Sequence, residues 1–191
     1  MQSKRKVLIM FTFCQFELNH HSIKLVYPDA KYATGLYEQV AANRATFSQW
    51  LPWAVLMHST IDEANFLAQA RTEIATNELI LVVILVDEQP AGMLDLHNIS
   101  QLNHQGEIGY WLGTDFQGQG IMTTALEKFA EKLFVTGQFH KLLLLADQAN
   151  KSSRAVATRV GFQHVGTLKE HLFLNDRFDD AELFELIAPT I

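Results

Sequence analysis

Cysteine is nearly absent from this sequence: Cys14 is the only one in 191 residues. A single thiol excludes an internal disulfide and is typical of a reducing compartment. Basic residues are also scarce, since 15 Lys and Arg stand against 21 Asp and Glu and give a formal net charge of −6. This balance argues against nucleic acid as the main ligand, because neutralising phosphates requires clustered positive charge. An acidic surface instead suits a cationic partner, such as a basic peptide or a polyamine.

Long hydrophobic runs are missing too. No apolar stretch reaches the roughly 18 residues of a membrane span. Residues 7–14 (VLIMFTFC) follow three basic residues and imitate a secretory signal, but no cleavage site of small residues comes after them. We interpret residues 1–15 as a mobile lead-in or an edge strand, with a true start at Met10 as an alternative, and we expect a cytoplasmic protein.

Glycine is sparse as well, yet three of the 10 glycines fall between Gly113 and Gly120. The residues before them, 107–112, are apolar and aromatic, as a buried strand requires. After them, apolar residues recur every four positions from Ile121, which predicts an amphipathic helix. A glycine loop at a helix start presents unpaired N–H groups and a partial positive charge, so it predicts a pyrophosphate site. A tight turn without a ligand is the alternative.

Two familiar phosphate loops do not fit this stretch. A Walker loop needs Gly-Lys-Ser/Thr, whereas Gly120 is followed by Ile121 and Met122. A dinucleotide fingerprint needs a third glycine where this chain has Thr123.

The remainder of the chain predicts a single mixed α/β domain over residues 16–188, since no repeat or linker interrupts it. Strands are expected at 16–26, 79–86, 91–99, 107–112, 141–146, 162–168, 172–174 and 181–187, and helices beginning near residues 29, 45, 60, 121 and 150. Thr60 and Glu63 match a capping box. A right-handed strand–helix–strand connection would make 141–146 parallel to 107–112.

Metal binding is not expected. His20 and His21 are adjacent, and adjacent residues on a strand point to opposite faces. No third ligand is suggested nearby.

The loop Gln117-Gly118-Gln119-Gly120-Ile121-Met122 resembles the acetyl-CoA loop of the Gcn5-related N-acetyltransferase (GNAT) family, Gln/Arg-x-x-Gly-x-Gly/Ala, with Met122 departing from the small last residue. The segments GEIGYWLGTDFQGQGI, NKSSRAVATRVGF, WLPW and LHNI are similar to the Rim-type branch, the ribosomal-protein N-terminal acetyltransferases. The resemblance covers residues 22–186. It implies an α/β (α+β mixed) fold: a central mixed sheet of six to seven strands, two of them parallel and splayed apart, flanked by about four helices.

The same resemblance implies an acetyl-CoA-dependent N-acetyltransferase that works by direct transfer without a metal. Its acceptor is expected to be a protein N-terminal α-amine, on a ribosomal or other basic protein. The alternatives are a small amine, such as a polyamine or an aminoglycoside, and a non-catalytic acyl-CoA-binding module. No nucleic acid or membrane partner is expected, and a homodimer is left open.

The resemblance also assigns the co-substrate to particular positions. Backbone groups of residues 110–112 would bind pantetheine and polarise the thioester, and the glycine loop would bind the pyrophosphate. The full set is Tyr110, Trp111, Leu112, Gln117, Gly118, Gln119, Gly120, Ile121, Met122, Asn150, Ser153 and Arg154.

For catalysis, the resemblance favours Glu107 as proton acceptor, with a carboxylate that merely orders the loop as the alternative. His97 is the second candidate because it titrates near neutrality, although a structural histidine is the alternative. Many family members protonate the thiol with a tyrosine, at the position of Ala157 here. Ser153 matches the serine of Rim-type relatives and is the expected donor to the sulfur, or else only a helix cap.

Trp50 and Trp53 are expected either to line the acceptor pocket with His97 or to fill a small core. One departure concerns a glutamate that some ribosomal-protein members place before the last hairpin, because Leu172 stands there. Glu170 is two residues away, which on a regular strand is the same face.

Overall fold

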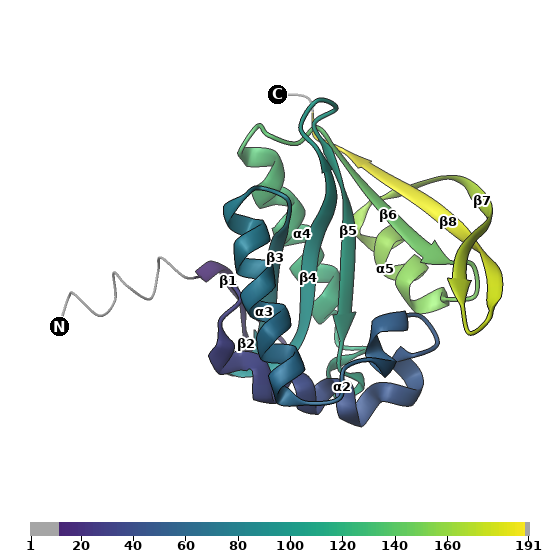
Figure 1. Cartoon of the computed structure of the whole chain (residues 1–191). Coiled ribbons are helices and arrows are strands. Elements are labelled where there is room, and N and C mark those ends of the chain that lie inside the picture. Colours follow the sequence, from purple (N-terminus) through teal and green to yellow (C-terminus); the bar gives the residue numbers. More distant parts are fainter. Residues whose placement is uncertain (1–11, 190–191) are drawn as a thin grey trace.

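Eight strands form one mixed sheet, and the computed structural model describes residues 12–189 of the chain (Figure 1). The strand order is β1-β2-β3-β4-β5-β6-β8-β7, and the β5–β6 pair is parallel while the other neighbours are antiparallel. The strands are β1 Thr12–Leu18, β2 His21–Val26, β3 Ile80–Val86, β4 Gln89–Ser100, β5 Gln105–Leu112, β6 Lys141–Asp147, β7 Gln163–Leu174 and β8 Arg177–Ile187.

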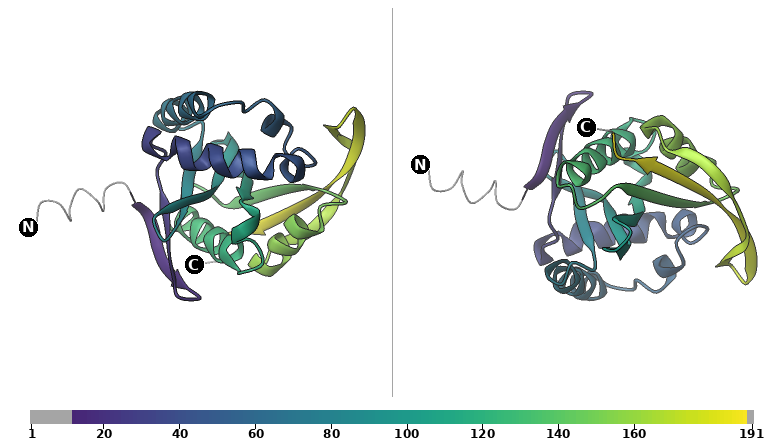
Figure 2. Two further views of the ribbon diagram at one scale, coloured as in Figure 1. Left: turned by 90° about the horizontal axis from the view of Figure 1, so that it is seen from below. Right: turned by 90° about the horizontal axis from the view of Figure 1, so that it is seen from above.

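The α-helices are α2 Ala33–Phe47, α3 Thr60–Ala75, α4 Ile121–Val135 and α5 Lys151–Val160, with short 3-10 turns at Ala30–Tyr32, Pro52–Val55 and Thr114–Phe116. The sheet lies between two helical layers: α2 and α3 cover one face and α4 and α5 the other (Figure 2). The predicted mixed α/β class with four helices is confirmed.

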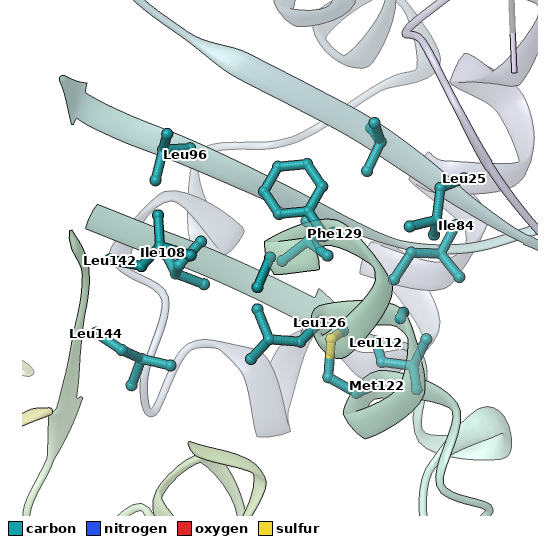
Figure 3. Packing of buried hydrophobic residues seen from close by; sticks show 14 of the residues in the cluster. Leu25, Ile84, Leu96, Ile108, Leu112, Met122, Leu126, Phe129, Leu142 and Leu144 are labelled. Atoms are coloured by element: carbon teal, nitrogen blue, oxygen red, sulfur yellow. The ribbon is translucent and has the colours of Figure 1, made fainter. Parts of the chain in front are cut away.

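Each helical layer encloses its own core, because alternate strand residues point to opposite faces. Under α4, Leu126 and Phe129 pack against Leu96 and Ile108 (Figure 3). Under α2 and α3, Leu36 and Leu67 pack against the other face of β3 and β4. Strand β3 contributes to both cores, which explains its uninterrupted apolar run.

The N-terminal strand is the main difference in strand count. The stretch 16–26 was predicted as one strand, but it is a hairpin of β1 and β2, whereas the predicted strands 162–168 and 172–174 form the single strand β7. The sheet therefore has eight strands rather than the six to seven that the resemblance implies. Asn19 and His20 form the turn with φ of 50° and 70°. Asparagine adopts this left-handed conformation more readily than most residues, which explains the turn without a glycine. The part of the lead-in prediction that concerns residues 1–11 lies outside the described residues.

One predicted helix and one predicted helix cap were wrong, although α3 begins at Thr60 as predicted. The separate helix at 45–50 does not exist, because Val40, Asn43 and Phe47 continue the buried face of α2 and nothing ends the helix before Phe47. The capping box is also displaced by one residue, since Ser59 is the N-cap of α3 and its hydroxyl accepts from the N–H of Asp62 at 3.2 Å.

The last strands are longer than predicted. Strand β7 runs from residue 163 to 174 with irregular register between Leu168 and Leu172, and the predicted turn at Asn175 and Asp176 is confirmed. Glu170 has a φ of 49°, so strict alternation does not relate it to position 172 as predicted. Within residues 12–189, no helix combines the length and the apolar character that crossing a membrane requires.

Candidate functional site

The parallel strands β5 and β6 pair over a short stretch and then separate. Their register runs from Gln105 opposite Lys141 to Ile108 opposite Leu144, and no later pair joins them among the described residues. Both strands continue, β5 to Leu112 and β6 to Asp147, and they diverge toward the bottom of Figure 1. The splayed parallel pair predicted from the sequence is therefore present.

The separation leaves main-chain groups of β5 without a β6 partner. The N–H of Gly113 donates to the carbonyl of Ala91 at 2.8 Å, so alternation directs the groups of Trp111 toward β4 and those of Tyr110 and Leu112 away from it. The side-chain amide of Gln117 occupies one of them, donating to the Leu112 carbonyl at 2.7 Å. The main chain of Tyr110 therefore faces the diverging strands.

The glycine loop directly follows this stretch. Gly118 and Gly120 have φ of 76° and 80°, a conformation that favours glycine, and Gly120 is the N-cap of α4. Within residues 12–189, the N–H groups of Gly118, Gln119 and Gly120 donate to no protein acceptor, and no side chain caps the helix. A Cβ built on Gly118 meets no described heavy atom within 4 Å. The loop therefore has both the free donors and the open space that an anion requires.

The β1–β2 turn supports this loop from across the sequence. The side-chain amide of Asn19 donates to the carbonyl of Gln119 at 2.9 Å. A Cβ on Gly120 would lie 4.0 Å from a methyl group of Leu18. Sequence reasoning missed this contact, since it joins segments a hundred residues apart.

Three titratable side chains form a cluster where β4 and β5 are paired. His97 Nδ1 lies 2.6 Å from Asp95 Oδ1, and His97 Nε2 lies 3.6 Å from Glu107 Oε1. Asn98 donates to the other carboxylate oxygen of Glu107 at 3.0 Å. A Cβ on Gly109 would lie 2.8 Å from Asp95 Oδ2, so the cluster also depends on that glycine. The two alternative bases thus belong to one unit, to which Asp95 adds a residue that sequence reasoning missed.

The cluster fixes the charge of its members. The hydrogen bond that His97 donates to Asp95, together with the nearby Glu107, raises the pKa of His97 to about 10, against the opposing effect of burial. The bond to His97 and the amide of Asn98 lower the pKa of Glu107, and the charge of His171 on β7 acts in the same direction. His97 is therefore an imidazolium at neutral pH, with no free lone pair, while Glu107 is an ionised acceptor.

Asp95→Asn is expected to return the pKa of His97 toward its ordinary value near 6.5, because it removes the strongest contact that favours the imidazolium. A raised pKa in the folded state stabilises the protein fully below the unfolded value and progressively less as the pH rises through about 10. The substitution should remove this part of the pH dependence of unfolding. NMR titration of the imidazole protons measures the pKa, and His104, whose Nδ1–H donates to the Gln138 carbonyl at 3.0 Å, is an internal control.

The first turn of α5 presents a hydroxyl pair. The Tyr110 hydroxyl lies 3.0 Å from the Ser153 carbonyl and 2.9 Å from Ser153 Oγ. The cap of this helix is Asn150, whose side chain accepts from the Ser153 N–H at 3.0 Å. Capping is therefore not the role of the Ser153 hydroxyl. The Arg154 guanidinium donates to the carbonyl of Gln148 at 2.9 Å, beside the start of α5.

The two tryptophans differ in their surroundings. Trp53 packs against Trp111, with ring centroids 6.0 Å apart, and both belong to the core under α2 and α3. Trp50 is half-buried and has no aromatic partner among the described residues. Trp53 thus lies on the sheet face that carries Glu107, since Glu107 and Trp111 are both odd-numbered positions of β5.

Strand β5 therefore carries two sets of candidate site residues on opposite faces. The acid–histidine cluster points to the α2/α3 side, and Tyr110 points to the α4/α5 side and Ser153. The edge of β5 that has separated from β6 lies between these two faces. Within the described residues, no group of three or more His, Cys, Asp or Glu side chains is arranged to hold a metal ion.

The family model for the acetyltransferase (GNAT) domain matches residues 23–163. The chain belongs to the GNAT family. This GNAT protein is 31% identical over 179 residues to YdaF of Bacillus subtilis, named provisionally as a ribosomal N-acetyltransferase, covering 93% of this chain and 96% of that one. It is 30% identical to the ribosomal-protein-serine acetyltransferase of Escherichia coli, over 80% of this chain and 85% of the relative.

Solved structures agree with the GNAT assignment. The microcin C7 self-immunity acetyltransferase MccE, in complex with acetyl-CoA and AMP, superposes with a TM-score of 0.84 at 29% identity, covering 86% of this chain and 92% of its own. The ribosomal L7/L12 acetyltransferase RimL, in complex with coenzyme A, gives 0.85 at 25% identity, covering 91% and 98%. The predicted family, GNAT fold and enzyme class, an acetyl-CoA-dependent N-acetyltransferase, are confirmed.

Proposed function

We propose that this GNAT enzyme transfers the acetyl group of acetyl-CoA directly to the α-amine at a protein N-terminus. The observation that carries the proposal is the early end of the β5–β6 pairing after Ile108, which leaves the main chain of Tyr110 unpaired next to the glycine loop. A pantetheine arm has the amide groups to replace the missing strand, and the loop has free N–H groups for the diphosphate.

The chain's own residues would then divide the reaction between them. Main-chain N–H at Tyr110 polarises the thioester oxygen, and the loop from Gln117 to Met122 holds the pyrophosphate. The amine attacks the thioester carbon, so a C–N bond forms while the C–S bond breaks with its electron pair on sulfur. Glu107, ionised and half-buried on the same strand, accepts the proton that leaves the amine.

The charge of the acceptor side supports a cationic amine. Two carboxylates around one imidazolium leave the cluster of Asp95, His97 and Glu107 with one net negative charge at neutral pH. An α-amine has a pKa near 8, so on the order of one molecule in ten is neutral at pH 7. For an alkyl amine, the neutral fraction at the same pH is on the order of one molecule in two thousand. A weak base such as Glu107 is better matched to the α-amine.

A polyamine is the second candidate acceptor. The acidic cluster would also attract a polycation, and the spermidine N(1)-acetyltransferase of Escherichia coli is 25% identical over 99 residues, which cover 52% of this chain. YdaF and the ribosomal-protein-serine acetyltransferase, which align over 93% and 80% of the chain, both carry ribosomal names, and this favours the peptide.

Release of thiol from acetyl-CoA tests the proposal. The acceptors are basic peptides with free Ser or Ala N-termini, the same peptides with blocked N-termini, and spermidine. We expect turnover with the free peptides alone. Turnover with spermidine alone would replace the α-amine by a polyamine, and bound CoA without thiol release from any amine would favour a binding module. The domain limits 16–188, a cytoplasmic location and a homodimer stay predictions.

A further inference from the structure

Tyr110 of β5 reaches both the separated strand edge and α5. Its main chain faces the diverging strands, and its hydroxyl lies against Ser153 in the first turn of α5. The ring packs against the core under α4, which restricts where the hydroxyl can point. No sequence motif assigned a role to this side chain.

The hydroxyl of Tyr110 has one proton and two acceptors within reach. One is the Ser153 carbonyl at 3.0 Å and the other is Ser153 Oγ at 2.9 Å. When the proton points to the carbonyl, the tyrosine oxygen is free to accept the serine proton. When the proton points to Oγ, the serine proton is released to donate elsewhere, and a donor that itself accepts a hydrogen bond is a stronger donor.

We propose that Tyr110 is a positioning residue, which donates to Ser153 Oγ and thereby directs the Ser153 proton to the sulfur as the C–S bond breaks. The inference rests on the proposed function, because acetyl-CoA must lie along the separated edge of β5. The electron pair of the broken bond stays on sulfur, and the resulting thiolate is stabilised by the serine hydroxyl. The thiolate takes its proton from water after it leaves.

The weak acidity of the Tyr110 hydroxyl explains why this group donates a hydrogen bond but does not transfer its proton. Burial raises the pKa of Tyr110 to about 12. A thiol has a pKa near 8.5, so proton transfer from this phenol to the thiolate is unfavourable by a factor of on the order of 10³. A hydrogen bond to an anion needs no transfer and is stronger than one between neutral groups.

A double-mutant cycle tests the proposal. We expect Tyr110→Phe to lower kcat about tenfold, the worth of one hydrogen bond, with the KM for acetyl-CoA within about twofold of the wild type. Ser153→Ala should lower kcat at least as much. In the Ser153→Ala background, Tyr110→Phe should cause no further loss, because the tyrosine acts through the serine. The conservative Ser153→Thr keeps a hydroxyl and should restore the dependence on Tyr110.

Tyr37→Phe is the matched control. The Tyr37 hydroxyl also donates to a main-chain carbonyl, that of His58 at 2.8 Å, but this bond joins α2 to the segment before α3 and involves neither β5 nor α5. We expect this variant to keep kcat. Thermal unfolding of each variant shows whether the fold is retained, and kcat is compared at a temperature at which every variant is folded.

Two results would overturn the inference: an unchanged kcat in Tyr110→Phe, or losses that multiply in the double variant. Failure of the proposed function is a separate outcome, since the wild type would then release no thiol with peptide acceptors.

Discussion

Gly120→Glu abolishes binding of acetyl-CoA, as measured by isothermal titration, with an expected rise in Kd of at least about a hundredfold. Gly120 is the N-cap of α4 with a φ of 80°, and a Cβ there meets a methyl group of Leu18 at 4.0 Å but nothing nearer within the described chain. The added carboxylate is therefore free to bind the same N–H groups that the diphosphate needs. It both occupies the site and repels the anion.

Two controls separate this charge effect from backbone strain. Gly120→Ala introduces the strain alone, about 1 kcal/mol or somewhat more for a residue other than glycine at positive φ. Gly137→Glu places the same side chain at a φ of 72°, again in open space, beyond the other end of the same helix. Both variants should bind acetyl-CoA, and retained binding by Gly120→Glu would refute the loop assignment.

Glu107→Gln should lower kcat by about 10²- to 10³-fold while the Kd for acetyl-CoA stays within about twofold. In the wild type, Asn98 donates to Glu107 Oε2 at 3.0 Å. Glutamine has the same size as glutamate and can keep this hydrogen bond, but it cannot accept a proton. The effect therefore isolates proton transfer from the acceptor. Steady-state kinetics with a peptide acceptor and binding of acetyl-CoA provide the two measurements.

Glu185→Gln is the matched control for Glu107→Gln. Glu185 is also a half-buried strand carboxylate in an ion pair, with Lys141 at 2.8 Å, but it lies on β8. This variant should keep kcat within about twofold. If Glu107→Gln retained the rate as well, Glu107 would be a structural carboxylate and the proton acceptor would lie elsewhere.

Features set by short stretches of sequence could be predicted. The strand, loop and helix around Gly113 and Gly120 follow from local apolar spacing and glycine chemistry, and the structure has them as β5, the left-handed glycines and α4. The parallel arrangement of β6 follows from the handedness of strand–helix–strand connections. The end of α2 at Phe47 and the N-cap of α3 at Ser59 were missed because burial and capping decide them, and single-residue patterns describe both poorly.

The site itself depended on contacts that no local pattern contains. Asp95 and His97 are two residues apart on β4, but their relation to Glu107 follows from the register of β4 against β5. The contact of Tyr110 with Ser153 depends on where α5 packs after the strands diverge. The sequence did place His97 and Glu107 on two neighbouring predicted strands. Predicting that their side chains meet would have required the register of those strands.

The short β5–β6 pairing divides the sheet into β1–β5 and β6–β8. A ligand with amide groups along this boundary would join the two parts by hydrogen bonds that the polypeptide does not supply. Binding free energy of that kind adds directly to resistance against unfolding and proteolysis. The lifetime of this enzyme in a cell should therefore rise with the concentration of acetyl-CoA, so that the metabolite acts as a structural component as well as a reactant.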